Sequence, residues 1–176
     1  LNQLVPLYLG ADLIADGRLG SRPFAQEKEP QEAGGQESAD QAAINQAGQI
    51  LPVIVAAFEQ YRHKFDPPSG VFSETPDTIR QKLERGGGFI ACDDQRIVGV
   101  VLYQPRPDYM YLGRLAVLPA YRGRQIATRL CASVEQAALE HHLPSLQLGV
   151  RIELRGNQQF FQRLGYHIKE YRCHEN

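Results

Sequence analysis

Residues 111–140, YLGRLAVLPAYRGRQIATRLCASVEQAALE, constrain the fold most because they join a buried strand to a long helix through a short basic loop. The apolar run at 115–118 predicts a buried strand, and Pro119 ends it by removing a backbone donor. From Ile126 apolar residues recur every three or four positions, which predicts a core-facing helix to about Glu140. The loop between strand and helix is where chemistry is expected.

The loop, RGRQIA at 122–127, is basic, contains glycine and stands at a helix start. A helix start carries unpaired N–H groups and the positive end of the helix dipole, so the loop suits a phosphate. The same residues also fit a solvated turn with two surface arginines, and the hexapeptide alone does not choose between these readings.

Strand, Pro119, loop and helix in this order resemble motif A of the GCN5-related N-acetyltransferases (GNAT), whose loop reads Gln/Arg-x-x-Gly-x-Gly/Ala. Arg122 and Ala127 match, and Gln125 replaces the central glycine, where a helical Gln would donate its N–H equally well. A second stretch, NQQFFQRLGY at 157–166, is similar to the family's late helix and the turn into its last strand. The resemblance implies that acetyl-CoA is the co-substrate and that its contacts come from Arg122, Gly123, Arg124, Gln125, Ile126, Ala127, Thr128, Asn157 and Phe160.

The expected fold class is α/β, with a GNAT-like mixed, largely antiparallel central sheet, flanking helices and the order β-α-α-β-β-β-α-β-α-β. Periodicity and turn residues predict strands at 42–45, 89–92, 97–103, 109–118, 145–150 and 166–173, and helices at 49–61, 75–85, 126–140 and 156–164. Pro52 would fall in a first helical turn, and Gly86–Gly88 would form a flexible connector. In the family fold the strands around the long helix splay apart, which implies that Leu115, Ala116 and Val117 pair with the pantetheine amides.

Composition predicts a single domain at residues 40–176 behind an N-terminal extension at 1–39. Residues 26–40 lack Phe, Val, Ile and Leu, which predicts a flexible linker. The remaining length suffices for one well-buried core. Residues 1–20 have no basic leader and fit a signal peptide poorly.

Charge and cysteine content exclude several classes of protein. The net charge of −1 does not favour nucleic acid or a membrane surface, and no apolar run reaches the roughly 18 residues that a membrane span needs. Cys92, Cys131 and Cys173 fit neither a disulfide framework nor a zinc pattern, so we expect no metal and a cytoplasmic location. The protein is expected to be a monomer or a homodimer.

The resemblance implies direct attack of an acceptor, most often a primary amine, on the thioester of acetyl-CoA. Such an amine titrates near ~10.4 and must lose a proton. Tyr111 stands where family members often have a Glu base, and Glu153, Glu74 or ordered water are alternatives. Phe161 occupies the position of the family's usual acid, a Tyr that protonates the leaving thiolate.

The acceptor, a small-molecule amine or a peptide amine, is expected to meet Glu74, Arg114 and Arg151. By resemblance, Asp66, Ser69, Glu74 and Thr75 are also candidates for substrate contact, although a capped surface loop explains them as well. A non-catalytic acyl-CoA-binding or interaction module on the same fold is the alternative function. A dinucleotide-dependent oxidoreductase would need an early Gly-rich strand-to-helix turn followed by an acid, which the chain lacks.

Overall fold

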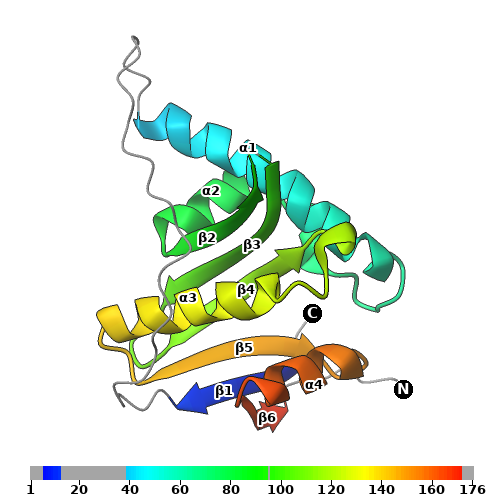
Figure 1. Cartoon of the computed structure of the whole chain (residues 1–176), viewed down its shortest axis with the longest axis vertical. Helices are drawn as coiled ribbons and strands as arrows, with labels where there is room; N and C mark the ends of the chain where they lie inside the picture. The colour runs from blue at the N-terminus through cyan, green and yellow to red at the C-terminus, as the bar shows by residue number, and fades with distance from the viewer. Residues whose placement is uncertain (1–5, 13–38, 95, 172–176) are drawn as a thin grey trace.

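The computed structural model describes residues 6–12, 39–94 and 96–171 (Figure 1). Its helices and strands are β1 Pro6–Asp12, α1 Ala39–Phe58, α2 Pro76–Glu84, β2 Gly87–Asp93, β3 Arg96–Pro105, β4 Met110–Val117, α3 Ile126–Glu140, β5 Ser145–Arg151, α4 Arg155–Arg163 and β6 His167–Tyr171. Three short 3-10 helices are η1 Glu59–Tyr61, η2 Gly70–Ser73 and η3 Pro119–Tyr121. Without these short helices, the order along the chain reads β-α-α-β-β-β-α-β-α-β.

The strands form one sheet in the order β2-β3-β4-β5-β1-β6. Every neighbouring pair is antiparallel except β4 and β5, which are parallel because α3 connects them as a crossover. The predicted mixed, largely antiparallel sheet with flanking helices is therefore confirmed.

Helices cover both faces of the sheet (Figure 1). On one face, α1 and α2 pack against Val100, Leu102 and Ala116. On the other, α3 and Phe161 of α4 pack against the apolar side chains of β3, β4 and β5. Within the described ranges, no helix is both long and apolar enough to cross a membrane.

The first strand was predicted at the wrong place. Residues 42–45 belong to α1, and the first strand is β1, which pairs with β5 and β6. The helical spacing of Ala47, Ile50, Ile54 and Ala57, all buried, extends the helix over the short segment, so Pro52 lies inside α1 and not in its first turn. β1 falls within residues 1–39, the predicted N-terminal extension. The domain boundary at residue 40 stays a prediction. The predicted linker, 26–40, lies outside the described residues except for its last two positions.

The sequence predicted a flexible connector at the three consecutive glycines, and this prediction was wrong. Gly87 and Gly88 open β2 and pair with β3. A Cβ at Gly86 would overlap the Tyr103 carbonyl oxygen, and one at Gly87 would come within 2.5 Å of the Tyr103 hydroxyl. A side chain would collide with the backbone of Tyr103 at Gly86 and with the Tyr103 ring at Gly87, so both positions favour glycine.

Candidate functional site

The parallel strands β4 and β5 separate halfway along their length. They pair only from Met110 to Leu112, opposite Leu146 to Leu148. Beyond this point β4 continues to Val117 against β3, and β5 continues to Arg151 against β1. A cleft of about 770 Å³ opens between them, and the edge of β4 that faces it has no strand partner among the described residues. Its backbone groups from Gly113 onward are available to an extended ligand with amides of its own.

An irregularity in β4 lies directly beside this edge. The register of β3 and β4 shifts between Val100 and Leu102, and Arg114 adopts the left-handed conformation with φ of 52°. Its guanidinium donates from Nε to Oε1 of Glu74 at 2.9 Å, across 40 positions of sequence. Lys82 and Thr78 donate to the same carboxylate. A bulge of this kind redirects the strand, and Glu74 fixes it from the segment before α2.

Glu74 is therefore poorly suited to act as a base. Its side chain is only 3% exposed and does not line the cleft. Burial acts to raise the pKa of this carboxyl, but hydrogen bonds from Lys82, Thr78 and Arg114 outweigh it and hold the pKa below its usual range. Glu153, the other candidate acid, is exposed and also lies outside the cleft lining.

The loop after β4 presents a row of backbone donors to the cleft. The helix α3 makes its first intrahelical bond from the N–H of Arg129 to the carbonyl of Gln125, at 3.1 Å. The N–H groups of Ile126, Ala127 and Thr128 precede that bond and have no acceptor within the helix. All three residues line the cleft together with Gly123, whose φ is 77°. Donors at the positive end of a helix dipole form a site for an anion such as a phosphate.

The side chain of Arg122 connects the basic loop to β4 and α1 through hydrogen bonds. Its Nε donates to the carbonyl of Val117 at 3.2 Å, and its Nη2 donates to the carbonyl of Ala57 at 2.8 Å. These bonds tie the loop to the ends of β4 and α1, two elements on the cleft wall. Its predicted contact with a cofactor stays a prediction and has to come from the remaining donors of the guanidinium.

Gln125 differs from the expected helical conformation. It is the N-cap of α3 and adopts φ of 59° and ψ of 13°, the left-handed region that glycine occupies without strain. Gln125 thus replaces the glycine of the family's pattern at a position where the backbone is left-handed. The prediction of a helical Gln at this position was wrong. The fold tolerates the strain because the loop on one side and α3 on the other fix the backbone.

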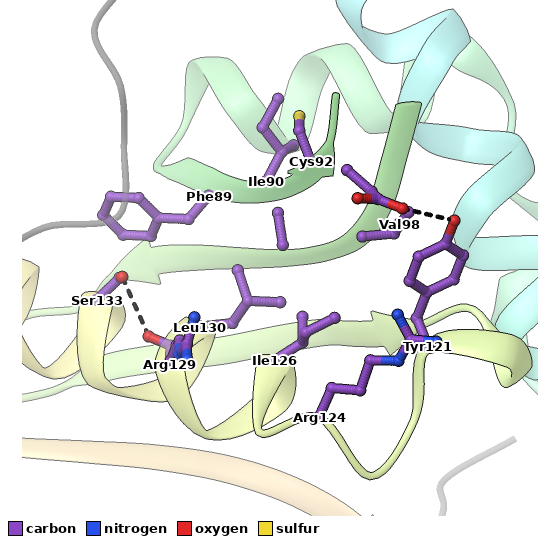
Figure 2. A pocket seen from close by; sticks show the side chains of 12 residues that line it. Phe89, Ile90, Cys92, Val98, Tyr121, Arg124, Ile126, Arg129, Leu130 and Ser133 are labelled. Atoms are coloured by element: carbon purple, nitrogen blue, oxygen red, sulfur yellow. Dashed lines mark hydrogen bonds between the residues drawn. The ribbon is translucent and has the colours of Figure 1, made fainter. Parts of the chain in front are cut away.

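Arg124 does not line the large cleft and instead lines a smaller pocket of about 190 Å³ between β2, β3 and α3 (Figure 2). Its guanidinium lies 5.0 Å from the centre of the Tyr121 ring. Tyr121 in turn donates its hydroxyl to Asp93 at 3.0 Å. Tyr121 and Ile126 line both cavities, so the basic loop separates them.

A row of aromatic rings forms another wall of the cleft. Phe58 contacts Tyr61 with ring centres 5.9 Å apart, and Tyr61 contacts Phe65 at 5.7 Å. The guanidinium of Arg151, from the end of β5, lies 4.7 Å over the Phe65 ring and donates to the carbonyl of Pro67 at 2.6 Å. The wall is thus fastened to β5 by a side chain 84 positions away in the sequence.

The late helix α4 places Asn157, Phe160 and Phe161 on the cleft. Phe161 is only 6% exposed and its ring packs edge-on between those of Phe160 and Tyr166. Tyr166, the neighbouring phenol, is buried outside the cleft lining, and its hydroxyl donates to Glu135 at 3.0 Å. Burial raises the pKa of Tyr166, so this phenol is not placed to assist at the cleft.

The hydroxyl of Tyr111 does enter the opening between the strands. It lies 3.7 Å from the position that a Cβ of Gly149, on β5, would occupy. Tyr111 lines the cleft, and no aspartate or glutamate does so in the part of the chain that the structure describes. Tyr111 is therefore a cleft group with a proton to exchange.

The cleft brings together most of the predicted site residues: Tyr111, Arg114, Leu115, Ala116, Val117, Arg122, Gly123, Gln125, Ile126, Ala127, Thr128, Arg151, Asn157, Phe160 and Phe161. Glu74, Glu153 and Arg124 do not line it. Sequence reasoning missed the aromatic wall, Gly149 and Arg163. The spacing of Phe58, Tyr61 and Phe65 by three and four positions is the signal that would have found the wall.

Comparison with known protein families shows that residues 56–166 match the acetyltransferase (GNAT) family. A search of curated protein sequences finds no significant match.

Three solved structures with a similar fold are distant in sequence. A GCN5-related N-acetyltransferase from Sphaerobacter thermophilus is 16% identical with a TM-score of 0.60, over 97% of this chain and 50% of that one, so this chain spans half of its length. The PaiA N-acetyltransferase of Thermoplasma acidophilum, in complex with coenzyme A, is 14% identical with a TM-score of 0.61, over 69% of this chain and 83% of that one. An aminoglycoside N-acetyltransferase in complex with CoA is 22% identical with a TM-score of 0.54, over 57% of this chain and 83% of that one.

Proposed function

This chain belongs to the acetyltransferase (GNAT) family, and we propose that it transfers the acetyl group of acetyl-CoA to a primary amine by direct attack. The amine nitrogen forms a bond to the thioester carbon and the carbon–sulfur bond breaks. The amine gives up a proton, and the departing thiolate takes one up. No covalent intermediate on the protein is needed, because the nitrogen attacks the thioester itself.

One observation carries the proposal: the open edge of β4 and the free N–H groups at the start of α3 line the same cleft. Acetyl-CoA has a chain of amides ending in a pyrophosphate. We assign the amides to Leu115, Ala116 and Val117, and the phosphates to the N–H groups from Gly123 to Thr128. The distant relatives solved with CoA support this use of the cleft.

Asn157 and Phe160 line the cleft from α4, and we assign them to the same ligand. Asn157 can hydrogen bond to its polar groups, and Phe160 offers an apolar surface to the carbon chain.

Proton transfer falls to groups that are weak acids and bases. Tyr111 and water are the candidates in the cleft, since Glu74 is held ionised by its cations and Glu153 lies outside. A tyrosine hydroxyl can pass a proton between the amine and solvent without being a strong base. Phe161 has no proton for the thiolate, but a thiol with a pKa near ~8.5 leaves readily, so the reaction proceeds more slowly without that acid.

A non-catalytic acyl-CoA-binding module is the second candidate. Two observations favour it. Phe161 stands at the family's acid position, and no carboxylate lines the cleft in the described part of the chain. Such a module would bind acetyl-CoA and release no CoA when amines are added.

Thermal unfolding with acetyl-CoA and NADH, followed by an amine panel scored for CoA release, tests the proposal. Acetyl-CoA at ~100 times its dissociation constant adds about 2.7 kcal/mol to the free energy of unfolding. For a chain of this size that raises the melting temperature by roughly 5–10 °C. NADH should give no shift. No shift with any acyl-CoA at millimolar concentration would contradict the proposal, and a shift without amine-dependent CoA release would favour the binding module.

A further inference from the structure

The aromatic wall of the cleft ends at a cation, Arg151, that forms no ion pair in the part of the chain that the structure describes, although the charge of Glu153 acts on it. Phe58, Tyr61 and Phe65 contact one another in series, and Arg151 closes the row over Phe65. The acceptors that Arg151 has there are the carbonyls of Pro67 and Pro68. Burial lowers the pKa of this guanidinium, although it stays charged at neutral pH.

The cleft as a whole carries positive charge. Arg114, Arg122, Arg151 and Arg163 line it, without any Asp or Glu among its described lining residues. Arg114 is neutralised by Glu74, and Arg122 is bonded to two carbonyls. Arg151 is partly buried and lies beside the aromatic rings. Among the described residues it forms hydrogen bonds to carbonyls and no ion pair, although the exposed Glu153 adds an electrostatic attraction.

We propose that the acceptor is an α-amino compound, an amino acid or a short peptide, with an aromatic or other apolar body that packs on this wall and a carboxylate that binds Arg151. This inference rests on the acetyl transfer proposed above and names its substrate class. The guanidinium keeps donors beyond the one that meets Pro67, and an arginine binds a carboxylate through two parallel hydrogen bonds. An apolar ring beside it gains the contact surface of Phe65 and Tyr61.

The lack of a cleft carboxylate bears on the amine as well. An α-amine of a peptide titrates near ~7.7–8.0 and an aliphatic amine near ~10.4, so at neutral pH the α-amine has roughly 300 times more of its reactive form. A cleft without a strong base therefore favours α-amines. Polyamines and aminoglycosides carry several positive charges, and a cleft lined by arginines repels them.

A matched pair of substrates tests the carboxylate. The dipeptide phenylalanyl-alanine and its C-terminal amide share the same α-amine and ring and differ in the terminal charge. We expect kcat/KM for the acid to exceed that for the amide by roughly 10- to 150-fold, the range of a hydrogen bond to a charged group. Spermidine and kanamycin should be poorer than both. Equal use of acid and amide, or preference for a polycation, would overturn the proposal.

The variant Arg151→Gln separates recognition from structure. We expect it to raise KM for the acid by roughly 10- to 150-fold more than KM for the amide, which loses only the support that Arg151 gives to the aromatic wall. Arg96→Gln, a matched loss of charge at an exposed residue outside the cleft, should change neither substrate. If Arg151→Gln weakens acid and amide equally, Arg151 only holds the loop at Pro67 and the assignment is wrong.

A binding measurement keeps this test apart from that of the proposed function. Calorimetric titration of the CoA-saturated protein with the two dipeptides should show tighter binding of the acid, and Arg151→Gln should abolish the difference. If no amine releases CoA from acetyl-CoA, the transfer reaction fails, yet the titration still decides whether Arg151 binds a carboxylate. If CoA is released but the two dipeptides bind alike, the substrate class fails and the transfer reaction stands.

Discussion

The two walls of the cleft are built from different chemistry. The wall formed by β4 and the loop at 122–128 presents backbone groups, whereas the wall formed by residues 57–70 presents aromatic rings beside Arg151. A backbone wall depends on dihedral angles, such as φ of 77° at Gly123, and tolerates many side chains. A side-chain wall depends on which residues stand there. The first wall therefore suits a ligand common to a family, and the second suits a ligand particular to one member.

The largest effect is expected from Gly123→Glu, which should weaken acetyl-CoA binding at the backbone wall in two ways. The new carboxylate would face the phosphates, and a residue with a Cβ is strained at φ of 77°. We expect acetyl-CoA affinity to fall by at least roughly 100-fold, given ~1–2 kcal/mol of strain and the added repulsion.

The melting shift with acetyl-CoA measures the loss. Gly48→Glu adds the same charge at an exposed position of α1 with open space around it and should keep the full shift. Normal binding by Gly123→Glu would show that the loop is not the phosphate site.

Phe161→Tyr restores a proton donor at the cleft and is expected to increase kcat at least tenfold if chemistry limits the rate. A positioned acid contributes about 10²- to 10⁴-fold, and water already supplies part of it. The KM for acetyl-CoA should hardly change, because only the transition state gains a hydrogen bond. Phe160→Tyr adds the same hydroxyl to the neighbouring ring and should give no increase in kcat. An unchanged kcat in a folded Phe161→Tyr variant would count against this placement of the acid.

Glu74→Gln tests the carboxylate that holds the bulge of β4. Because its side chain is 3% exposed while Lys82 and Arg114 keep some exposure, we expect a loss of about 2–3 kcal/mol in the free energy of unfolding, less than for a fully buried pair. This lowers the melting temperature by roughly 5–10 °C. Glu84→Gln, at an exposed carboxylate paired with Arg80, should cost less than ~1 kcal/mol.

The effect of Glu74→Gln should also depend on pH. The folded pKa of Glu74 lies below its usual value, so its stabilisation is complete above the unfolded pKa of ~4.3 and is lost as the pH falls through the folded pKa. The difference in melting temperature between wild type and variant should therefore be constant at pH 5–8 and should shrink as the pH falls below ~4.3. A difference that does not shrink at any pH below ~4.3 would mean that the charge of Glu74 is not the source of the effect.

The smallest effect is expected from Gln125→Gly, which relieves the left-handed strain at the N-cap of α3. The gain should be about 1 kcal/mol or less, equivalent to a rise of roughly 2–4 °C in melting temperature. Gln125→Ala retains a Cβ and should give no rise. If glycine lowers the melting temperature instead, side-chain contacts of Gln125 outweigh its backbone strain.

The same contrast between walls explains what the sequence could predict. The backbone wall lies within one continuous stretch, where Pro119, the loop and the periodicity from Ile126 are all local signals. The side-chain wall depends on a pair far apart in sequence, Arg151 with Pro67, and the bulge of β4 depends on another, Arg114 with Glu74; no local pattern reveals either pair. The dihedral angle of Gln125 escaped prediction because its residue type favours the helical conformation that the turn forbids.

Hydrogen–deuterium exchange with and without CoA tests the central claim most directly, since that claim concerns backbone groups. We predict slower exchange on CoA binding at residues 113–117 of β4 and 123–128 at the start of α3, with little change at 87–93 of β2. Protection confined to β2 and the α3 residues around the small pocket of Figure 2, with none at 113–117, would contradict the account.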